Sequence, residues 1–305
     1  MFPYYLHLGP YTIHPHLFFE ALSYVVAFYV YLKLRRRFGD PIVTPLRWAA
    51  VAAAVAGAAL GAKLLFWLED PHLTLENLHN PAYFVGGKTI VGALAGGLIT
   101  VELMKRYIGL GTSTGDLYAI PLALGIAIGR MGCFLTGISD NTYGIPTNLP
   151  WGINFGDGVP RHPTQLYEIA FLLLLIPILY RTLQKIVIPS AAVTKRSEVT
   201  AKSRDPYPIK SAVSVPIPPM SNDEQPTTLS LKAGSLTPAS FLPGDAFKLF
   251  MISYMTFRLL ADFIKPYPRL FLGLGGIQWA CVLTLVYYSR DIARWLVPKG
   301  RAVTH

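Results

Sequence analysis

The feature that most constrains this chain is a series of long apolar runs separated by short polar segments. Hydrophobic residues make up 52% of the 305 positions and charged residues only 14%, whereas a soluble domain carries about 25% charged residues. A helix needs roughly 17–25 apolar residues to cross a bilayer, and several runs are that long. The sequence therefore predicts an all-α membrane protein and excludes a soluble globular domain.

Seven transmembrane helices are expected, at residues 17–34, 46–68, 88–104, 117–136, 164–182, 244–263 and 272–294. No Lys or Arg precedes the first run and no small-residue cleavage site follows it. We therefore expect this run to stay in the membrane and not to be removed as a signal peptide.

Basic residues gather at alternate ends of these runs, and this distribution sets the orientation. They are Lys33, Arg35, Arg36, Arg37, Arg47, Lys105, Arg106, Arg294, Lys299 and Arg301. The positive-inside rule then predicts an N-terminus outside and a C-terminus in the cytoplasm. Because the rule accounts for much of the net charge of +10, a nucleic-acid partner is not expected.

The chain divides into three parts by composition. Residues 1–182 hold helices one to five and an outer loop at 137–163, and residues 244–305 hold helices six and seven with a cytoplasmic tail. Between them, residues 183–243 are rich in Ser, Pro, Thr and Lys, a composition that cannot bury enough apolar surface to order itself. We expect a disordered cytoplasmic insert, acting as a linker or as a partner-binding segment.

Two arginines lie inside predicted spans, where a charge is costly and needs a reason. Arg130 lies about 20 Å along its helix from the cytoplasmic start, and Arg258 about 18 Å along its own, at 1.5 Å per residue. Asp262, four residues after Arg258, can pair with it on one helix face. Arg130 has no such partner, so the sequence favours an external anion, and arginine suits the phosphate of a phospholipid.

Other polar residues near the predicted outer face are further candidates. Tyr254 shares the helix face of Arg258 and Asp262, which indicates a protein interior or wet cavity. Glu20 either lines that cavity or is a paired interfacial carboxylate, and Lys88 either attracts a headgroup or snorkels. His162, in the outer loop, is a general acid or base or a structural histidine. No Cys/His cluster is visible, so no metal or other cofactor is expected.

Four stretches together resemble the prolipoprotein diacylglyceryl transferase family. They are GRMGCFLTG around Arg130 with Gly144 after it, RHPTQLYE at 161–168, YMTFRLLAD at 254–262 and GLGGIQW at 273–279. The resemblance implies seven spans in the bacterial inner (plasma) membrane. It also implies transfer of diacylglyceryl from phosphatidylglycerol to the lipobox cysteine of a prolipoprotein signal peptide, with release of glycerol phosphate.

The resemblance also assigns site residues. Arg130 and Arg258 are expected to hold the phosphate, with Tyr254 in support and Gly144 shaping the site. Substrate contacts are further expected from Gln165, Tyr167, Lys88 and Glu20.

The sequence departs from the family pattern where protons are handled. Val91 stands where the family has the histidine of a His-Gly-Gly motif, Cys133 replaces its asparagine, and Asp262 replaces a glutamate. The base is then His162, Asp140 or Glu20. The alternatives to the transferase are a relative that uses another acceptor and a non-catalytic phospholipid-binding protein.

Overall fold

The computed structural model describes residues 2–40, 42, 44–202 and 241–296, with the backbone alone for residues 8 and 187–202. The principal helices are α1 (Pro15–Phe38), α2 (Thr44–Glu69), α5 (Ile90–Tyr107), α6 (Asp116–Thr136), α7 (Thr164–Lys202), α8 (Asp245–Ala261) and α9 (Gly276–Tyr287). The shorter elements are β1 (Leu6–Leu8), β2 (Tyr11–Ile13), α3 (Pro71–Glu76), α4 (Pro81–Val85), η1 (Gly137–Asp140), β3 (Ile153–Asn154), β4 (Pro160–Arg161), η2 (Asp262–Ile264) and α10 (Ser289–Leu296).

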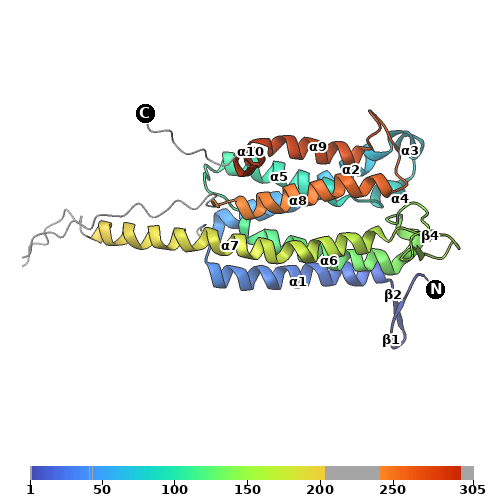
Figure 1. The fold of residues 1–305 in the computed structure, drawn as a ribbon, viewed down its shortest axis with the longest axis horizontal. Coiled ribbons are helices and arrows are strands. Elements are labelled where there is room, and N and C mark those ends of the chain that lie inside the picture. The colour runs from blue at the N-terminus through green and yellow to red at the C-terminus, as the bar shows by residue number, and fades with distance from the viewer. Residues whose placement is uncertain (1, 41, 43, 203–240, 297–305) are drawn as a thin grey trace, which may run out of the picture.

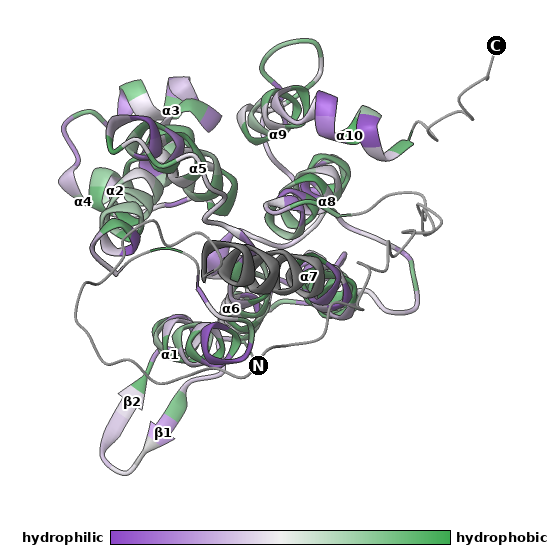
Figure 2. Cartoon of the chain, turned by 90° about the vertical axis from the view of Figure 1, so that its left-hand side faces the viewer, coloured by the Kyte–Doolittle hydropathy of each residue, from purple (hydrophilic) through white to green (hydrophobic). Residues whose placement is uncertain are grey.

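The principal helices run side by side along the long axis of the molecule, as Figure 1 shows. The two antiparallel hairpins, β1–β2 and β3–β4, lie together with α3 and α4 at one end. Figure 2 looks along the bundle and shows α6 near its middle, with α2 and α5 as a pair at one side. The core of the bundle therefore forms around α6, which packs on α1, α7 and α8.

Four helical segments among the described residues are long and apolar enough to cross a membrane. They are Pro15–Phe38, Thr44–Glu69, Asp116–Asp140 and Thr164–Ile186. The other three predicted spans coincide with α5, α8 and α9, which are shorter or more charged. The predicted class, a mostly helical protein with membrane-capable helices, is confirmed at this level.

Small residues explain why α2 and α5 pack so closely. A side-chain carbon added at Gly96 would meet the backbone oxygen of Gly57, and one added at Gly61 would lie 2.8 Å from the Cα of Gly96. Thr100 Oγ1 donates across the interface to the carbonyl of Ala53 at 2.7 Å. Close backbone approach of this kind is a common way for helices to associate where lipid gives no hydrophobic drive.

The predicted seventh span is interrupted. Helix α9 ends at Tyr287 and a separate helix, α10, begins at Ser289 and turns away from it. Residues 289–296 carry three charges, of which Asp291 binds Lys248 and Arg294 binds Asp245, both at the start of α8. The prediction of one continuous helix over 272–294 was wrong because these charges tie α10 across the end of the bundle.

The predicted disordered insert begins too early. Residues 183–202 continue α7, and Leu183 and Ile186 are buried. They extend the buried stripe of Leu172, Leu175 and Leu179 at helical spacing, so the expectation of disorder was wrong there. Residues 203–240 lie outside the described residues. The outer loop 137–163 is also less irregular than expected, because it contains η1 and the β3–β4 hairpin.

Candidate functional site

The arginines of α6 and α8 converge on one carboxylate near the hairpin end of the bundle. Arg130 Nε lies 2.9 Å and Arg258 Nη1 3.1 Å from Oε2 of Glu168, which is in the second turn of α7. Tyr254 donates its hydroxyl to Glu168 Oε1 at 2.6 Å. All four side chains are buried, so a charged centre has formed where three helices meet.

Glu168 is a carboxylate partner for Arg130, for which the sequence analysis had favoured an external anion. This carboxylate comes from a neighbouring helix, α7, and not from the helix of Arg130 itself. The signal was present, since Glu168 ends the RHPTQLYE stretch and is a carboxylate at the head of an apolar run. The predicted pairing of Arg258 with Asp262 is present at 2.8 Å.

Several buried polar atoms of this centre have no hydrogen-bond partner among the described residues. They are the Nε atoms of Arg130 and Arg258, Oδ2 of Asp262 and Oε1 of Gln165. The 2.9 Å contact of Arg130 Nε with Glu168 is thus an ion pair by distance that lacks hydrogen-bond geometry. Buried polar groups are normally satisfied by protein or by ordered water, so these atoms are candidates for contact with a ligand or a water molecule.

Lys265 adds a cation that the sequence reasoning missed. It follows η2, outside the helical spans, and its side chain is 1% exposed with Nζ 3.8 Å from Asp262 Oδ1. Burial, and then the nearby charges of Arg258 and Arg130, lower the pKa of Lys265 to about 7. An anion bound here would favour the charged form of this lysine.

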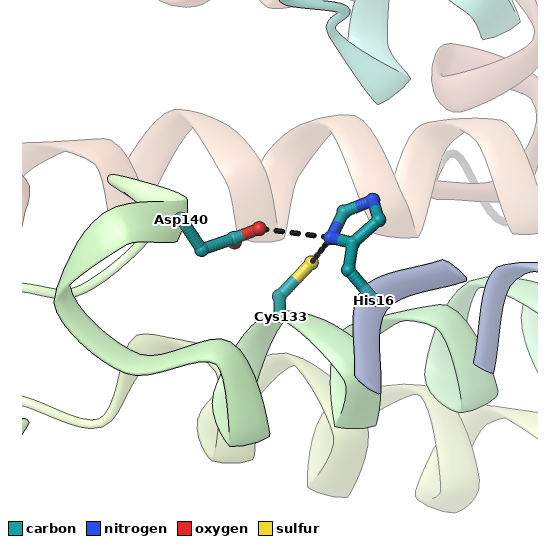
Figure 3. A group of neighbouring side chains, drawn as sticks. All are labelled: His16, Cys133 and Asp140. Atoms are coloured by element: carbon teal, nitrogen blue, oxygen red, sulfur yellow. Dashed lines mark hydrogen bonds and ion pairs between the residues drawn. The ribbon is translucent and has the colours of Figure 1, made fainter. Parts of the chain in front are cut away.

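A second cluster joins α1, α6 and η1, as Figure 3 shows. His16 Nδ1 lies 2.9 Å from Asp140 Oδ1 and 4.0 Å from the sulfur of Cys133. Cys133 is in turn 3.9 Å from Nη1 of Arg130, so the cluster adjoins the arginine centre. The expectation that no Cys/His cluster exists was wrong, because 117 residues separate His16 from Cys133 in the chain.

Two of the three predicted bases lie on either side of His16. Asp140 faces its Nδ1, while Glu20 Oε2 lies 3.6 Å from its Nε2. Glu20 also pairs with Lys88 and accepts from Tyr24 at 3.2 Å. His16 stands in the first turn of α1, and no sequence pattern had singled it out.

The third predicted base, His162, belongs to a separate group of side chains with Tyr167 and Trp151. Its Nδ1 is 3.2 Å from the hydroxyl of Tyr167, which accepts from Trp151 at 2.8 Å. Tyr167 and Trp151 line a surface pocket of about 590 Å³. Gly144 lies against this group, since a side-chain carbon there would come within 2.6 Å of His162 Cβ. No interaction described for His162 reaches either arginine.

Thr142 links Asp140, in the cluster around His16, to Gln165 at the start of α7. Its hydroxyl donates to Asp140 Oδ2 at 2.5 Å and accepts from Nε2 of Gln165 at 3.1 Å. Val91 has an aliphatic side chain that cannot transfer protons, and it is 1% exposed within the apolar core.

Comparisons with known proteins agree with the motifs. A family model described as prolipoprotein diacylglyceryl transferase matches residues 3–200, a range that includes Arg130 and Glu168 but not Arg258. Proteins named phosphatidylglycerol–prolipoprotein diacylglyceryl transferase are similar to this chain in Bordetella bronchiseptica (33% identity over 175 residues), Cupriavidus pinatubonensis (32% over 179) and Geobacter sulfurreducens (31% over 153).

The matched regions are partial on both sides. They cover 54%, 54% and 48% of this chain and 64%, 62% and 57% of the respective relatives. The chain therefore spans less than two thirds of the length of these curated relatives.

Proposed function

Because the chain belongs to the prolipoprotein diacylglyceryl transferase family, we propose that it transfers diacylglyceryl from phosphatidylglycerol to the lipobox cysteine of a prolipoprotein signal peptide. Glycerol phosphate is the other product. The observation that carries this proposal is the convergence of Arg130 and Arg258 on Glu168, with buried N–H donors left over.

The arginine centre serves as the phosphate site. Glu168 fixes the two guanidinium groups, and the phosphate ester binds guanidinium N–H groups that do not face Glu168, such as Nε of Arg258. During transfer the bond from the glyceryl carbon to the phosphate oxygen breaks and the oxygen keeps the electron pair. Fixed cations stabilise that developing charge, and Tyr254 supports them through its bond to Glu168.

His16 takes the proton of the acceptor thiol. An ionised Asp140 can only accept a hydrogen bond, so Nδ1 of His16 keeps its proton, and Nε2 is the position that acts as the base once it has lost its own proton. Glu20, at 3.6 Å from Nε2, is too distant for a hydrogen bond. The thiolate formed in this way attacks the glyceryl carbon and the new carbon–sulfur bond completes the transfer.

The remaining predicted residues take supporting roles. Gly144 lets His162 pack closely against the loop, because there is no side chain between them. Gln165 positions Thr142 beside Asp140. Lys88 and Glu20 form a partly exposed charged pair on the Nε2 side of His16. Tyr167 and His162, next to the 590 Å³ pocket, contact substrate outside the arginine centre.

We assign the protein to the bacterial inner membrane with seven spans, an external N-terminus and a cytoplasmic C-terminus. The basic residues Arg35, Arg47 and Lys105 support this orientation, because the positive-inside rule puts their end of the bundle in the cytoplasm. The first part then contains the spanning helices α1, α2, α5, α6 and α7. Residues 203–240 form a cytoplasmic insert, and α8 to α10 form the last part.

Transfer by the purified protein tests the proposal. The protein is mixed with phosphatidylglycerol and a lipobox peptide, and the release of glycerol phosphate and the mass of the peptide are followed. Arg130→Ala should lower turnover by at least about 100-fold, since losing one transition-state donor has this effect. The control Arg161→Ala, which removes an outer-loop pair with Asp157, should leave turnover unchanged.

Two results would contradict the proposal. Turnover retained in Arg130→Ala would mean that Arg130 does not form a phosphate site needed for transfer. Retention of phosphatidylglycerol without release of glycerol phosphate would instead identify a lipid-binding protein.

A further inference from the structure

The cluster of His16, Cys133 and Asp140 has the donor set of a metal site. Its three ligand atoms, an imidazole nitrogen, a thiol sulfur and a carboxylate oxygen, all lie within 4.8 Å of one another. They converge from the first turn of α1, the last turn of α6 and η1 (Figure 3). Imidazole and thiolate ligands suit zinc among the common divalent ions.

We propose that His16 Nδ1, Cys133 Sγ and Asp140 Oδ1 bind a divalent zinc-class ion. Three protein ligands leave the fourth position of a tetrahedral ion for water or another small ligand. Two anionic ligands and a neutral imidazole also balance the charge of the ion.

The distances suit such an ion after small movements. Bond lengths of about 2.0–2.3 Å put tetrahedral ligand atoms about 3.3–3.7 Å apart. The nitrogen-to-oxygen distance is 2.9 Å and the nitrogen-to-sulfur distance 4.0 Å. Both differ from the tetrahedral values by less than about 1 Å, which side-chain rotation can supply without moving a helix.

The groups behind the ligands are those that metal sites use. A histidine that binds a metal usually gives its other N–H to a carboxylate, and the carboxylate on that side of His16 is Glu20, whose Oε2 lies 3.6 Å from Nε2, slightly beyond hydrogen-bond distance. Thr142 donates to the second oxygen of Asp140 at 2.5 Å. Arg130 Nη1, 3.9 Å from the sulfur of Cys133, favours the thiolate that a metal needs.

The packing of α1 on α6 holds the ligands together. A side-chain carbon at Gly132 would lie 3.1 Å from the Cα of His16 and 2.9 Å from Cβ of Phe19, so the glycine brings His16 beside Cys133. Cys133 is buried and the side chain of Asp140 is 8% exposed, while the side chain of His16 is 33% exposed. An ion can therefore enter from the His16 side.

The site has a consequence that rests on the proposed function. A metal on Nδ1 displaces the proton that this nitrogen donates to Asp140. Asp140 then binds the metal and no longer accepts a hydrogen bond from His16. With Nε2 then carrying the ring proton, His16 can no longer accept one from the acceptor thiol. Zinc is therefore expected to inhibit transfer reversibly, with recovery on adding a chelator.

Cobalt binding tests the site without any measurement of transfer. Co²⁺ is added to the full chain purified in detergent, and the near-ultraviolet charge-transfer absorption that reports cobalt–thiolate bonds is recorded. We expect one equivalent to bind, the band to be lost in Cys133→Ser, and zinc to displace the cobalt. The matched control is Cys281→Ser, which changes the buried thiol of α9 and should keep the band.

A second variant guards against misfolding of Cys133→Ser. Asp140→Asn should retain the band but lower the affinity for cobalt at least about 10-fold, while His72→Ala, at an exposed histidine of α3, should not. No band in the folded native protein, or an undiminished band in Cys133→Ser, would overturn the proposed site. Because neither readout uses phosphatidylglycerol, failure here is distinct from failure of the transferase.

Discussion

At the scale of single residues, the site depends on contacts between segments that are far apart in the chain. Motifs located Arg130, Arg258 and Tyr254, because a charge in an apolar run is visible in one sequence. They did not reveal Glu168 as the shared partner, nor His16 as the neighbour of Cys133 beside the arginine centre. Those contacts come from helices that pack only in the folded protein, where no spacing rule applies.

His16 is expected to carry the proton step. His16→Ala should lower transfer by roughly 100- to 10,000-fold, the range for loss of a general base, without changing the retention of phosphatidylglycerol. His162→Ala is the comparison, and its loss should be much smaller because His162 contacts Tyr167 and not the arginine centre. Equal losses in the two variants would contradict the assignment of His16.

Lys265 is expected to make stability depend on pH. Its pKa of about 7 lies below the ordinary value of about 10.4 that holds in the unfolded chain. Between these values the unfolded state binds more protons, so the free energy of unfolding rises with pH, by at most about 1.4 kcal/mol per unit.

The comparison variant is Lys265→Met, which keeps the length of the side chain and removes its charge. Unfolding midpoints of the two proteins in detergent should diverge between pH 7 and 10, with the rise seen in the native chain alone. An identical rise in both proteins would mean that another group titrates.

At the scale of elements, the sequence predicted where helices lie better than where they end. Apolar length located all seven principal helices, because the need to satisfy backbone polar groups in lipid leaves few alternatives. It could not predict the break at Tyr288 or the continuation of α7 to Lys202, because these depend on the Lys248 and Arg294 ion pairs and on the burial of Leu183.

Neighbouring glycines of α5 offer a matched test of the α2–α5 interface. Gly96→Ala forces a methyl group against the backbone of Gly57, whereas the carbon added by Gly97→Ala would be 3.4 Å from its nearest neighbour, an ordinary contact. Gly96→Ala should cost about 1–3 kcal/mol of stability and Gly97→Ala little. Thermal unfolding in detergent measures both, and equal midpoints would refute the close packing of these helices.

At the scale of the whole molecule, the buried site groups lie toward one end of the bundle.

The composition of residues 203–240 predicts a dispensable insert. Replacing these residues by a Gly/Ser linker of equal length should leave the rate of transfer within about two-fold of the native rate, since such a linker behaves as a flexible coil. A deletion that starts at residue 183 should be harmful, because Leu183 is buried in the core. Loss of transfer in the well-inserted linker variant would make the insert part of the enzyme.

Complementation is the most direct test of the proposed transferase reaction at Arg130. The chain is expressed in a bacterium depleted of its own prolipoprotein diacylglyceryl transferase, and survival is scored with the lipid modification of a lipobox reporter. We predict rescue by the native chain and none by Arg130→Ala at equal membrane insertion. Failure of the well-inserted native chain to modify the reporter, or rescue by Arg130→Ala, would contradict a transferase reaction at Arg130.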